Sequence, residues 1–385
     1  MRDERGRLNP VSRVLLVLAR PRNAVLPVGF GAPILGFGVP ILRSALARRA
    51  RHTRRRAWQG GPKLASGGPI ENNRAPMRIL VTGADGFLGG HLADGLQQEG
   101  HEVFRSVYAR AAGSDEVRVD LSLPDQLARL PARVDAVVHA AGNVDPTRSR
   151  SVMVSANVLA TKHLLAWAAQ QRCRHFVHFS SVAVYGALAL GEERDEHTPR
   201  LGRVLGLPYM RTKAHAEHLV EQSGVPYTLL RPPAVLGAGD AVVSRGFLDA
   251  LGPGGVPMLP GASRERRVSL ACVEGLVQIV RLLLTYGPLY APLHAVDLEL
   301  TFGELAAAYA RVLGREFQYV PTSWAQALRL RNEVGLAWLI ASSRFGQHYR
   351  CDRLVSKLGY RSQLSLDSAI QSGLSGLQGA KLGLF

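Results

Sequence analysis

Cysteine is scarce in this chain of 385 residues. The three cysteines, Cys173, Cys272 and Cys351, lie far apart and lack the paired spacing of a metal site. We therefore expect free, buried thiols in a reducing cytosol, with neither a metal site nor a disulfide framework. The cysteine pattern thus predicts a cytoplasmic protein.

Acidic residues are also few, because 30 Asp and Glu stand against 47 Lys and Arg, a formal net charge of +17. Residues 1–76 hold 15 basic and three acidic side chains and carry +12 of this charge, while residues 77–385 carry only +5. The excess therefore belongs to the N-terminal extension and does not imply a basic groove on the body. We expect a small-molecule substrate and no nucleic-acid partner.

Charge is absent from residues 23–42, which are flanked by arginines. Twenty uncharged residues could just span a bilayer. Three prolines and four glycines within them, however, deplete the helical hydrogen bonding that lipid cannot replace. For residues 1–76 the alternatives are a membrane anchor, an Arg-rich targeting peptide, and a disordered or artefactual leader before a natural start at Met77. We favour the disordered or artefactual leader among these alternatives. We expect no membrane contact for the catalytic body, residues 77–385.

Glycine is plentiful where the body begins. An apolar, strand-like run at residues 79–81 meets Gly83, Gly86 and Gly89 at the spacing G-x-x-G-x-x-G, and an amphipathic helical pattern follows. Such glycines let the chain turn, let a pyrophosphate approach the backbone, and let helix and strand pack closely. The turn predicts a bound dinucleotide. The residues expected to contact it here are Gly83, Asp85, Gly86, Phe87, Leu88 and Gly89.

Strand-like and helical patterns alternate after this turn. The strand-like runs lie at 102–107, 117–120, 136–139 and 175–179, and a helical run covers 152–170. This alternation predicts an α/β fold with a Rossmann-type, doubly wound parallel sheet. We expect residues 77–233 to form an NAD(P)-binding domain that shares parts of the following segment. Residues 234–385 would mainly form a smaller C-terminal α/β substrate domain.

The end of the second strand lacks an acid between Phe104 and Ser114, where NAD-preferring enzymes usually carry one for the ribose 2′-hydroxyl. Arg105 and Arg110 lie there instead. Because a guanidinium pairs with a 2′-phosphate, we predict NADP in preference to NAD, the alternative being two solvated surface arginines. After the fourth strand, small residues fit a backbone that passes close to a flat ligand. They are Ala140, Ala141 and Gly142.

Tyr209 and Lys213 are four residues apart at the start of a helical run, which places the phenol and the ammonium on one face. A nearby cation favours phenolate, so Tyr209 could exchange a proton with a substrate hydroxyl while hydride moves to or from a nicotinamide. Lys213 would also reach the ribose hydroxyls. Ser181, after the fifth strand, would hydrogen-bond the reacting oxygen. Taken alone, Tyr209 and Lys213 could equally lie on a solvent-exposed helix face, and Ser181 could simply cap the turn after the fifth strand.

Together these motifs resemble the extended short-chain dehydrogenase/reductase family, also called the NAD-dependent epimerase/dehydratase family. The matching elements are Thr82-Gly83-x-x-Gly86-x-x-Gly89, Asp120-Leu121, His139-Ala-Ala-Gly142, Asn157, Ser180-Ser181-x-x-Val184-Tyr185-Gly186, Tyr209-x-x-x-Lys213 and Arg231-Pro232. The resemblance implies a catalytic set of Ser181, Tyr209 and Lys213. It also implies that Asp120 contacts adenine, with Leu121 and Pro232 at the cofactor, and that Asn157 supports the active-site helix or its water. We also expect a homodimer.

Departures from the family pattern narrow the activity. Val182 and Ala183 stand where related 4,6-dehydratases carry an acid pair, so dehydration is not expected. The asparagine that 4-epimerases place shortly after this arginine is absent after Arg231, which weakens the epimerase interpretation. In its favour, Arg267 lies where relatives place an arginine on the substrate pyrophosphate, the alternative being a surface arginine cluster. The leading hypothesis is an NAD(P)-dependent oxidoreductase acting at a secondary alcohol or ketone, with a nucleotide-sugar as the favoured substrate. The alternatives are a nucleotide-sugar 4-epimerase, a 3β-hydroxysteroid dehydrogenase-like activity and a non-catalytic cofactor-binding protein.

Overall fold

The computed structural model describes residues 75–145, 148–186, 193–205, 207–251, 255–330 and 333–378. The anchor, targeting and leader alternatives for the N-terminal extension, and its candidate span at 23–42, lie outside the described residues.

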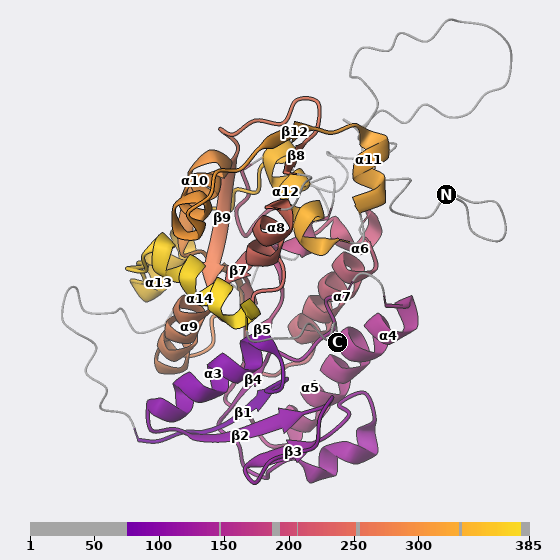
Figure 1. Ribbon diagram of the computed structural model, residues 1–385. Helices are drawn as coiled ribbons and strands as arrows, with labels where there is room; N and C mark the ends of the chain where they lie inside the picture. The colour runs from indigo at the N-terminus through magenta and orange to yellow at the C-terminus, as the bar shows by residue number, and fades with distance from the viewer. Residues whose placement is uncertain are drawn as a thin grey trace, which may run out of the picture. The chain divides into compact units, whose positions relative to one another are not determined.

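The first part of the described chain alternates strands with helical segments (Figure 1). Its elements are β1 (Arg78–Thr82), α3 (Phe87–Gln98), β2 (Glu102–Val107), β3 (Glu116–Arg118), η1 (Pro124–Arg129), β4 (Ala136–His139), α4 (Arg150–Val154), η2 (Ser155–Leu159), α5 (Ala160–Gln170), β5 (His175–Phe179), η3 (Val182–Tyr185), α6 (Gly202–Leu205), α7 (Pro208–Gln222) and β6 (Tyr227–Arg231). The strands predicted at 102–107, 136–139 and 175–179 agree with these bounds, the first strand extends one residue farther at each end, and the third begins and ends earlier than expected.

The second part mixes shorter strands with helices. Its elements are β7 (Ala234–Leu236), α8 (Val243–Ala250), β8 (Val256–Met258), β9 (Arg267–Cys272), α9 (Val273–Tyr286), β10 (Pro292–His294), β11 (Leu298–Thr301), α10 (Phe302–Leu313), β12 (Tyr319–Pro321), α11 (Trp324–Arg329), α12 (Val334–Phe345), α13 (Asp352–Leu358) and α14 (Leu366–Gln378).

Seven parallel strands form the main sheet in the order β10-β6-β5-β4-β1-β2-β3. The chain runs outward from β1 through β2 to β3 and then returns to β4 on the other side of β1. The order of strands therefore reverses between β1 and β4, where a doubly wound sheet opens a crevice at its carboxyl edge. The predicted Rossmann-type fold is confirmed.

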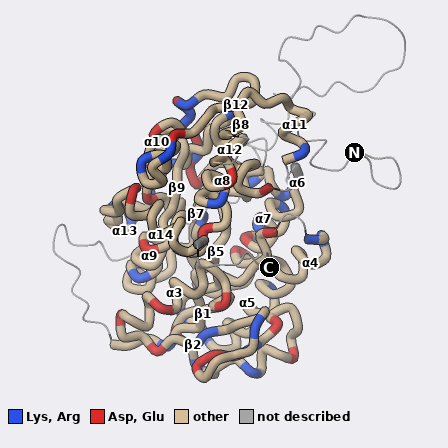
Figure 2. The backbone as a smooth tube through the Cα atoms, in the orientation of Figure 1, with Lys and Arg blue, Asp and Glu red and all other residues tan. Residues whose placement is uncertain are grey.

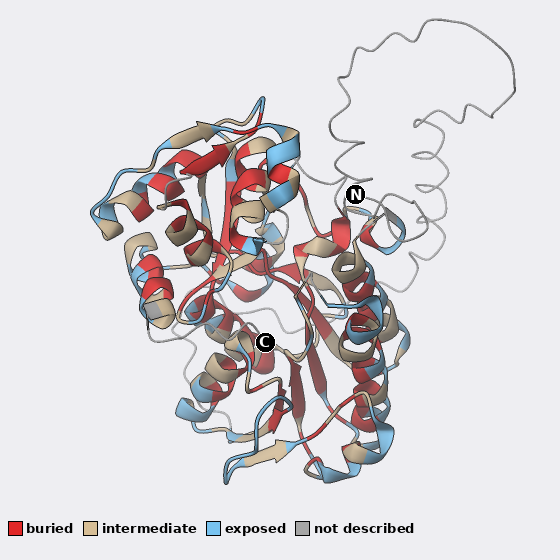
Figure 3. Cartoon of the chain, turned by 45° about the vertical axis from the view of Figure 1, so that its right-hand side comes forward, coloured by how far each residue is buried: buried red, intermediate tan, exposed pale blue. Residues whose placement is uncertain are grey.

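Helices cover both faces of this sheet because its strands are apolar on both sides. One face packs on α3, α9 and α13, with Ile79 and Val138 among the buried strand residues. The other packs on η1, α5 and α7, with Leu80 and Val137 facing that way. Figure 3 shows the strands buried in the middle of the sandwich and the exposed residues on the outer faces of the helices. Part of the C-terminal segment therefore belongs to the main sheet and its helices, because β10 is a strand of that sheet and α9 and α13 pack on it.

The smaller part of the fold is built on β9, which pairs with β7 and β11, and on the β8 and β12 pair. Its core joins α8, α10, α12 and α14 around residues such as Phe247, Phe302 and Tyr309. Basic and acidic residues are interspersed over the described chain (Figure 2), which agrees with the modest charge of the body. The segment Arg150–Gln170 is long and apolar enough to cross a membrane, but half of it is buried inside the domain. It is therefore a core helix of the sandwich.

Candidate active site

The glycine turn lies at the carboxyl end of β1, beside the segment that leaves β4. Gly83 has a φ of +71°, and a Cβ placed on it would lie 2.8 Å from Ala141 Cα. A Cβ on Gly89 would lie only 2.0 Å from the carbonyl oxygen of Gly83. Side chains at either position would therefore push the turn away from β4 or the helix away from the strand.

The turn leads straight into helix α3, whose first residue follows Gly86. No side chain caps this end of the helix, and no acidic residue occupies its first turn. The leading backbone amides therefore remain available to an anion, and the helix dipole favours one. This cradle of small residues and free amides fits the pyrophosphate of a dinucleotide, which Phe87 and Leu88 would meet through their backbone.

The acid predicted within the turn, Asp85, turns toward the end of β2. Its Oδ2 accepts hydrogen bonds from the backbone amides of Tyr108 and Ala109 at 2.8 and 2.7 Å. Asp85 therefore joins the turn to the strand end at which a dinucleotide's adenosine ribose lies in this fold.

Both arginines of the NADP prediction already have acidic partners. Arg105 donates to Asp94 on α3 at 2.7 Å. Arg110 pairs with Glu116 on β3, and its side chain is 52% exposed. A 2′-phosphate would have to compete with these carboxylates for the two guanidinium groups.

The remaining cofactor residues predicted by resemblance lie at strand ends. Asp120 follows β3, and its Oδ1 accepts from the backbone and hydroxyl of Ser122 at 2.9 and 2.7 Å. Leu121 is buried in the core beneath it. Pro232 follows β6, and its carbonyl accepts the amide of Val182 at 3.2 Å.

Ser181 and Tyr209 meet at the carboxyl edge of β5. Ser181 caps η3, with its hydroxyl accepting the amide of Ala183 at 3.1 Å. Tyr209 lies in the first turn of α7 and is half-buried. Burial raises the pKa of the Tyr209 phenol, and a hydrogen bond with Ser181 partly offsets this. The phenol therefore holds its proton at neutral pH next to a second hydroxyl.

Lys213 lies one helical turn after Tyr209 and is buried. Its Nζ donates to the carbonyl oxygen of Phe179, at the end of β5, at 2.8 Å. Burial lowers the pKa of Lys213 to about 8, although the charge of Glu217 opposes this. The expectation that the lysine would depress the pKa of Tyr209 is thus corrected, because burial dominates the phenol and the ammonium points at a backbone oxygen.

Asn157 joins the β4 exit to the catalytic helix. Its Nδ2 donates to Asn143 O at 2.9 Å and to Thr212 Oγ at 3.0 Å, and its Oδ1 accepts the Asn143 amide at 2.6 Å. A Cβ on Gly142 would lie 2.9 Å from Asn157 Oδ1 and 3.4 Å from Lys213 Nζ. The predicted cofactor and catalytic residues of β4, η2 and α7 therefore converge at one place.

A buried ion pair farther along α7 escaped the sequence reasoning. Glu217 is 0% exposed and accepts two hydrogen bonds from Arg231, both at 2.7 Å. Arg231 also donates to the Tyr185 hydroxyl at 3.0 Å. Glu217 continues the four-residue spacing of Tyr209 and Lys213, which was the available signal for a residue on the same helix face.

Arg267, the predicted substrate residue, lies at the start of β9, away from the catalytic set in the sequence and in its contacts. Its side chain is 54% exposed and approaches Glu299 at 3.4 Å. Nearby, Arg266 and Arg344 each have a buried Nε without a hydrogen-bond partner among the described residues, and neither pairs with a carboxylate there. The backbone bond from Ser263 to Ser343 joins the segments that carry these two arginines.

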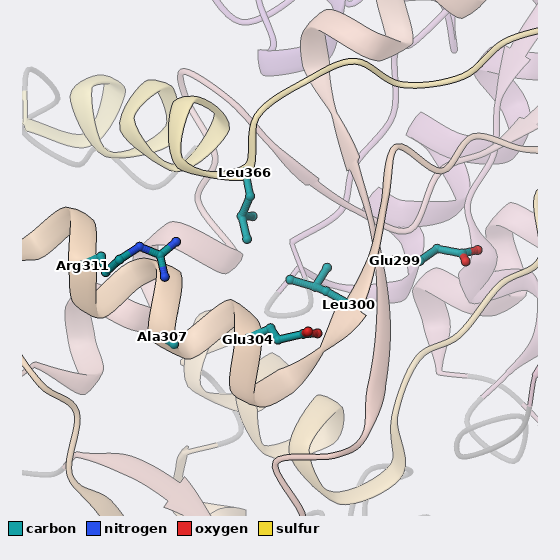
Figure 4. A pocket seen from close by; sticks show the side chains of 6 residues that line it. All are labelled: Glu299, Leu300, Glu304, Ala307, Arg311 and Leu366. Atoms are coloured by element: carbon teal, nitrogen blue, oxygen red, sulfur yellow. The ribbon is translucent and has the colours of Figure 1, made fainter.

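A separate surface pocket lies on β11, α10 and α14 (Figure 4). It is lined by Glu299, Leu300, Glu304, Ala307, Arg311 and Leu366. Glu304 caps α10 and Arg311 pairs with Asp367, so these charged groups are already engaged. The predicted catalytic residues all lie on other elements.

Comparison with known proteins agrees with this geometry. Residues 79–267, which hold the glycine turn, Ser181, Tyr209 and Lys213, match the model of the NAD dependent epimerase/dehydratase family. The chain resembles this family over these residues, which make up just under half of its length. The match ends at Arg267, so it covers the cofactor-binding layer and the start of the smaller part.

Two curated relatives of the chain are named as redox enzymes. The 2-alkyl-3-oxoalkanoate reductase of Stenotrophomonas maltophilia (strain K279a) is 32% identical over 207 residues, covering 50% of this chain and 58% of the relative. The dTDP-6-deoxy-L-talose 4-dehydrogenase (NAD(P)(+)) of Kitasatospora kifunensis is 33% identical over 178 residues, covering 43% of this chain and 54% of the relative. The chain thus spans little more than half the length of these relatives.

A solved structure agrees in fold. The UDP-glucuronic acid 4-epimerase from Bacillus cereus, in complex with NAD, superposes with a TM-score of 0.60 at 16% sequence identity. The match covers 78% of this chain and 99% of the epimerase. At this identity the likeness shows the fold alone.

Proposed function

We propose that this protein is an NAD(P)-dependent oxidoreductase that reduces a ketone or oxidises the corresponding secondary alcohol. The observation that carries the proposal is the meeting of Ser181 and Tyr209 at the sheet edge, on the side where the glycine turn and Gly142 leave their strands. A hydroxyl pair beside a dinucleotide cradle suits chemistry at a single C–O bond.

Burial raises the pKa of Tyr209, so the phenol carries the proton that the acid in a reduction must hold. A protonated phenol can donate its proton to the substrate oxygen as negative charge develops there, and the Ser181 hydroxyl can donate a hydrogen bond to the same atom. A reduced nicotinamide, when bound, would supply the hydride to the carbonyl carbon, and the proton from Tyr209 would complete the alcohol. Lys213, whose Nζ lies near Gly142, would hold the ribose of that cofactor.

For the cofactor, we propose a preference for NADP over NAD. The absence of an acid after β2 and the presence of Arg105 and Arg110 support it, although both guanidinium groups would first have to leave Asp94 and Glu116. The relative named as an NAD(P)(+) dehydrogenase is consistent with use of either cofactor.

For the substrate, we propose a nucleotide-sugar bearing the reacting ketone. Arg266 and Arg344 lack carboxylate partners among the described residues, so their charges are available to a phosphate-bearing substrate. The sugar dehydrogenase among the relatives supports this choice. The oxoalkanoate reductase supports an acyl ketone instead, so the substrate panel includes both.

The test follows NADPH and NADH consumption with purified chain over keto-sugar nucleotides, 3-oxoalkanoates and ketosteroids. Tyr209→Phe should lower kcat/KM by roughly 10²- to 10⁴-fold, because the substrate loses its proton donor. Tyr290→Phe, at an exposed tyrosine, is the matched control and should retain wild-type activity. Interconversion of UDP-hexoses without net NAD(P)H consumption would replace the reductase with a 4-epimerase. Full activity of Tyr209→Phe would refute the proposed mechanism.

A further inference from the structure

A chain of buried hydrogen bonds runs from the glycine turn to Asn157 through the interior of the sheet sandwich. Thr82 Oγ lies 2.8 Å from His139 Nδ1 and accepts the Ala141 amide at 3.3 Å. His139 Nε2 lies 3.0 Å from Thr161 Oγ, which donates to the carbonyl oxygen of Asn157 at 2.8 Å. Thr82, His139 and Thr161 are each 0% exposed.

The proton positions in this chain follow from its two ends. A hydroxyl has one proton, and Thr161 donates it to the carbonyl oxygen of Asn157, which can only accept a hydrogen bond. Thr161 Oγ must therefore accept from His139, so Nε2 carries the ring proton. Burial lowers the pKa of His139 to about 3, and the charge of Lys213 adds to the effect, so the ring is neutral and Nδ1 is bare. Thr82 then donates to Nδ1, and every bond in the chain points the same way.

The series of hydrogen bonds continues from Asn157 to α7, the helix that carries Tyr209. The Asn157 side chain donates to Thr212 Oγ at 3.0 Å, and Thr212 donates to the carbonyl oxygen of Tyr209 at 2.9 Å. Asn157 lies within η2, a single π-helical turn between α4 and α5, and such turns are frequent at functional sites. Thr161, at the start of α5, bonds back to the carbonyl oxygen four residues earlier and so ties the end of this turn to the His139 ring.

We propose that His139 and Thr161 are positioning residues that connect the dinucleotide turn to the catalytic helix by fixing Asn157. The proposal rests on the proposed function, since it concerns how Tyr209 is held for the same reaction. In the proposal the His139 ring is the Nε2–H tautomer. Its Nδ1 accepts a hydrogen bond from Thr82, and its Nε2 donates one to Thr161. Loss of the Thr161 hydroxyl would leave Nε2–H without an acceptor and release the Asn157 carbonyl.

The decisive substitution is Thr161→Val, which removes the hydroxyl and keeps the side-chain shape. Its matched control is Thr228→Val on β6. Thr228 is also 0% exposed and its hydroxyl also meets a buried histidine ring, that of His175, at 2.9 Å, but this pair has no bond to Asn157. Both variants lose one buried histidine–threonine bond, so stability alone would not separate them.

We expect Thr161→Val to lower kcat roughly tenfold through misplacement of Tyr209, with NADH and NADPH dissociation constants within about twofold of wild type. Thr161→Ser, which restores the hydroxyl, should recover most of the lost turnover, and Thr228→Val should retain wild-type kcat. Hydrogen exchange in the ligand-free chain gives a second readout. The amides of residues 155–161 should exchange faster in Thr161→Val than in Thr228→Val.

Equal kcat values for Thr161→Val and Thr228→Val, or failure of Thr161→Ser to recover turnover, would overturn the positioning role. Equal exchange at residues 155–161 in the two valine variants would overturn it as well. If the wild-type chain turns over no carbonyl in the panel, the proposed function fails. The exchange comparison still decides whether Thr161 holds the π-helical turn, so the two failures are distinguishable.

Discussion

Replacing Glu217 by glutamine should destabilise the fold strongly, because it removes one charge from a buried ion pair without changing the side-chain shape. Both Glu217 oxygens accept from Arg231 at 2.7 Å, and Arg200 donates to the same carboxylate at 2.9 Å. A glutamine presents an amide donor to at least one of these donors. Arg231, which is 2% exposed, would keep its charge without a full counter-charge.

The magnitude follows from this burial. Removing one partner of a buried salt bridge costs about 3–5 kcal/mol, because the remaining ion stays out of water unpaired. Glu221, one turn farther along α7, is the matched control. It pairs with Arg200 at 2.8 Å, but the two side chains are 25% and 29% exposed. Glu221→Gln should therefore cost below about 1 kcal/mol.

Urea unfolding of the wild type and both variants measures these losses, and its pH dependence supplies a second check. Burial raises the pKa of Glu217, but Arg231 and Arg200 outweigh burial, so the pKa lies below its ordinary value of 4.5. A carboxyl whose folded pKa is depressed stabilises the fold fully above its unfolded pKa and loses that contribution as pH falls through the folded value. The difference between wild type and Glu217→Gln should therefore be full at pH 7 and shrink below about pH 4.5.

A loss of about 1 kcal/mol or less for Glu217→Gln, equal to that of Glu221→Gln, would refute this reasoning. So would a difference from wild type that stays constant from neutral to acid pH. Either result would mean that water or a rearranged side chain compensates Arg231.

Three further predictions concern the site. Gly89→Ala should abolish tight NADPH and NADH binding in a fluorescence titration, since its Cβ would lie 2.0 Å from Gly83 O; affinity within about twofold of wild type would contradict the packing role. Joint replacement of Arg105 and Arg110 by alanine should weaken NADPH binding about tenfold and leave NADH binding unchanged, and equal effects on both would remove the NADP preference. Burial lowers the pKa of Lys213 to about 8, so the ammonium loses its proton as pH rises through this value, and kcat/KM should fall with the lost charge. A flat profile of kcat/KM up to about pH 10 would contradict a need for the charged Lys213 side chain in the reaction.

Short-range spacing explains why much of the cofactor-binding layer was predictable. The glycine turn, its flanking strand and helix, and the Tyr209 and Lys213 pair each depend on residues within a few positions of one another. The predicted strands at 102–107, 136–139 and 175–179 match β2, β4 and β5 because apolar runs between turns leave few other structures. The doubly wound order then follows from alternation of strands and helices.

Charge partners were less predictable than backbone elements. Arg105 and Arg110 were expected to face a phosphate, but the fold brings Asp94 and Glu116 against them. Lys213 was expected to act on the phenol of Tyr209, whereas packing of α7 on the sheet directs it to Phe179 O. A side-chain ion has several reachable partners, and only the packed geometry selects among them.

By itself, the sequence determined the α/β class and the strand–turn–helix at Gly83, because these depend on local periodicity and spacing; its assignment of Ser181, Tyr209 and Lys213 to catalysis stays a prediction. Tertiary structure decided the π-helical turn at Asn157, the single tautomer of His139 and the Glu217 pair. Thr82 and His139 are 57 residues apart, and His139 and Thr161 are 22 apart. Their bonds exist because parallel strands and the helices packed on them bring distant polar groups into a water-free interior, where each must find a partner.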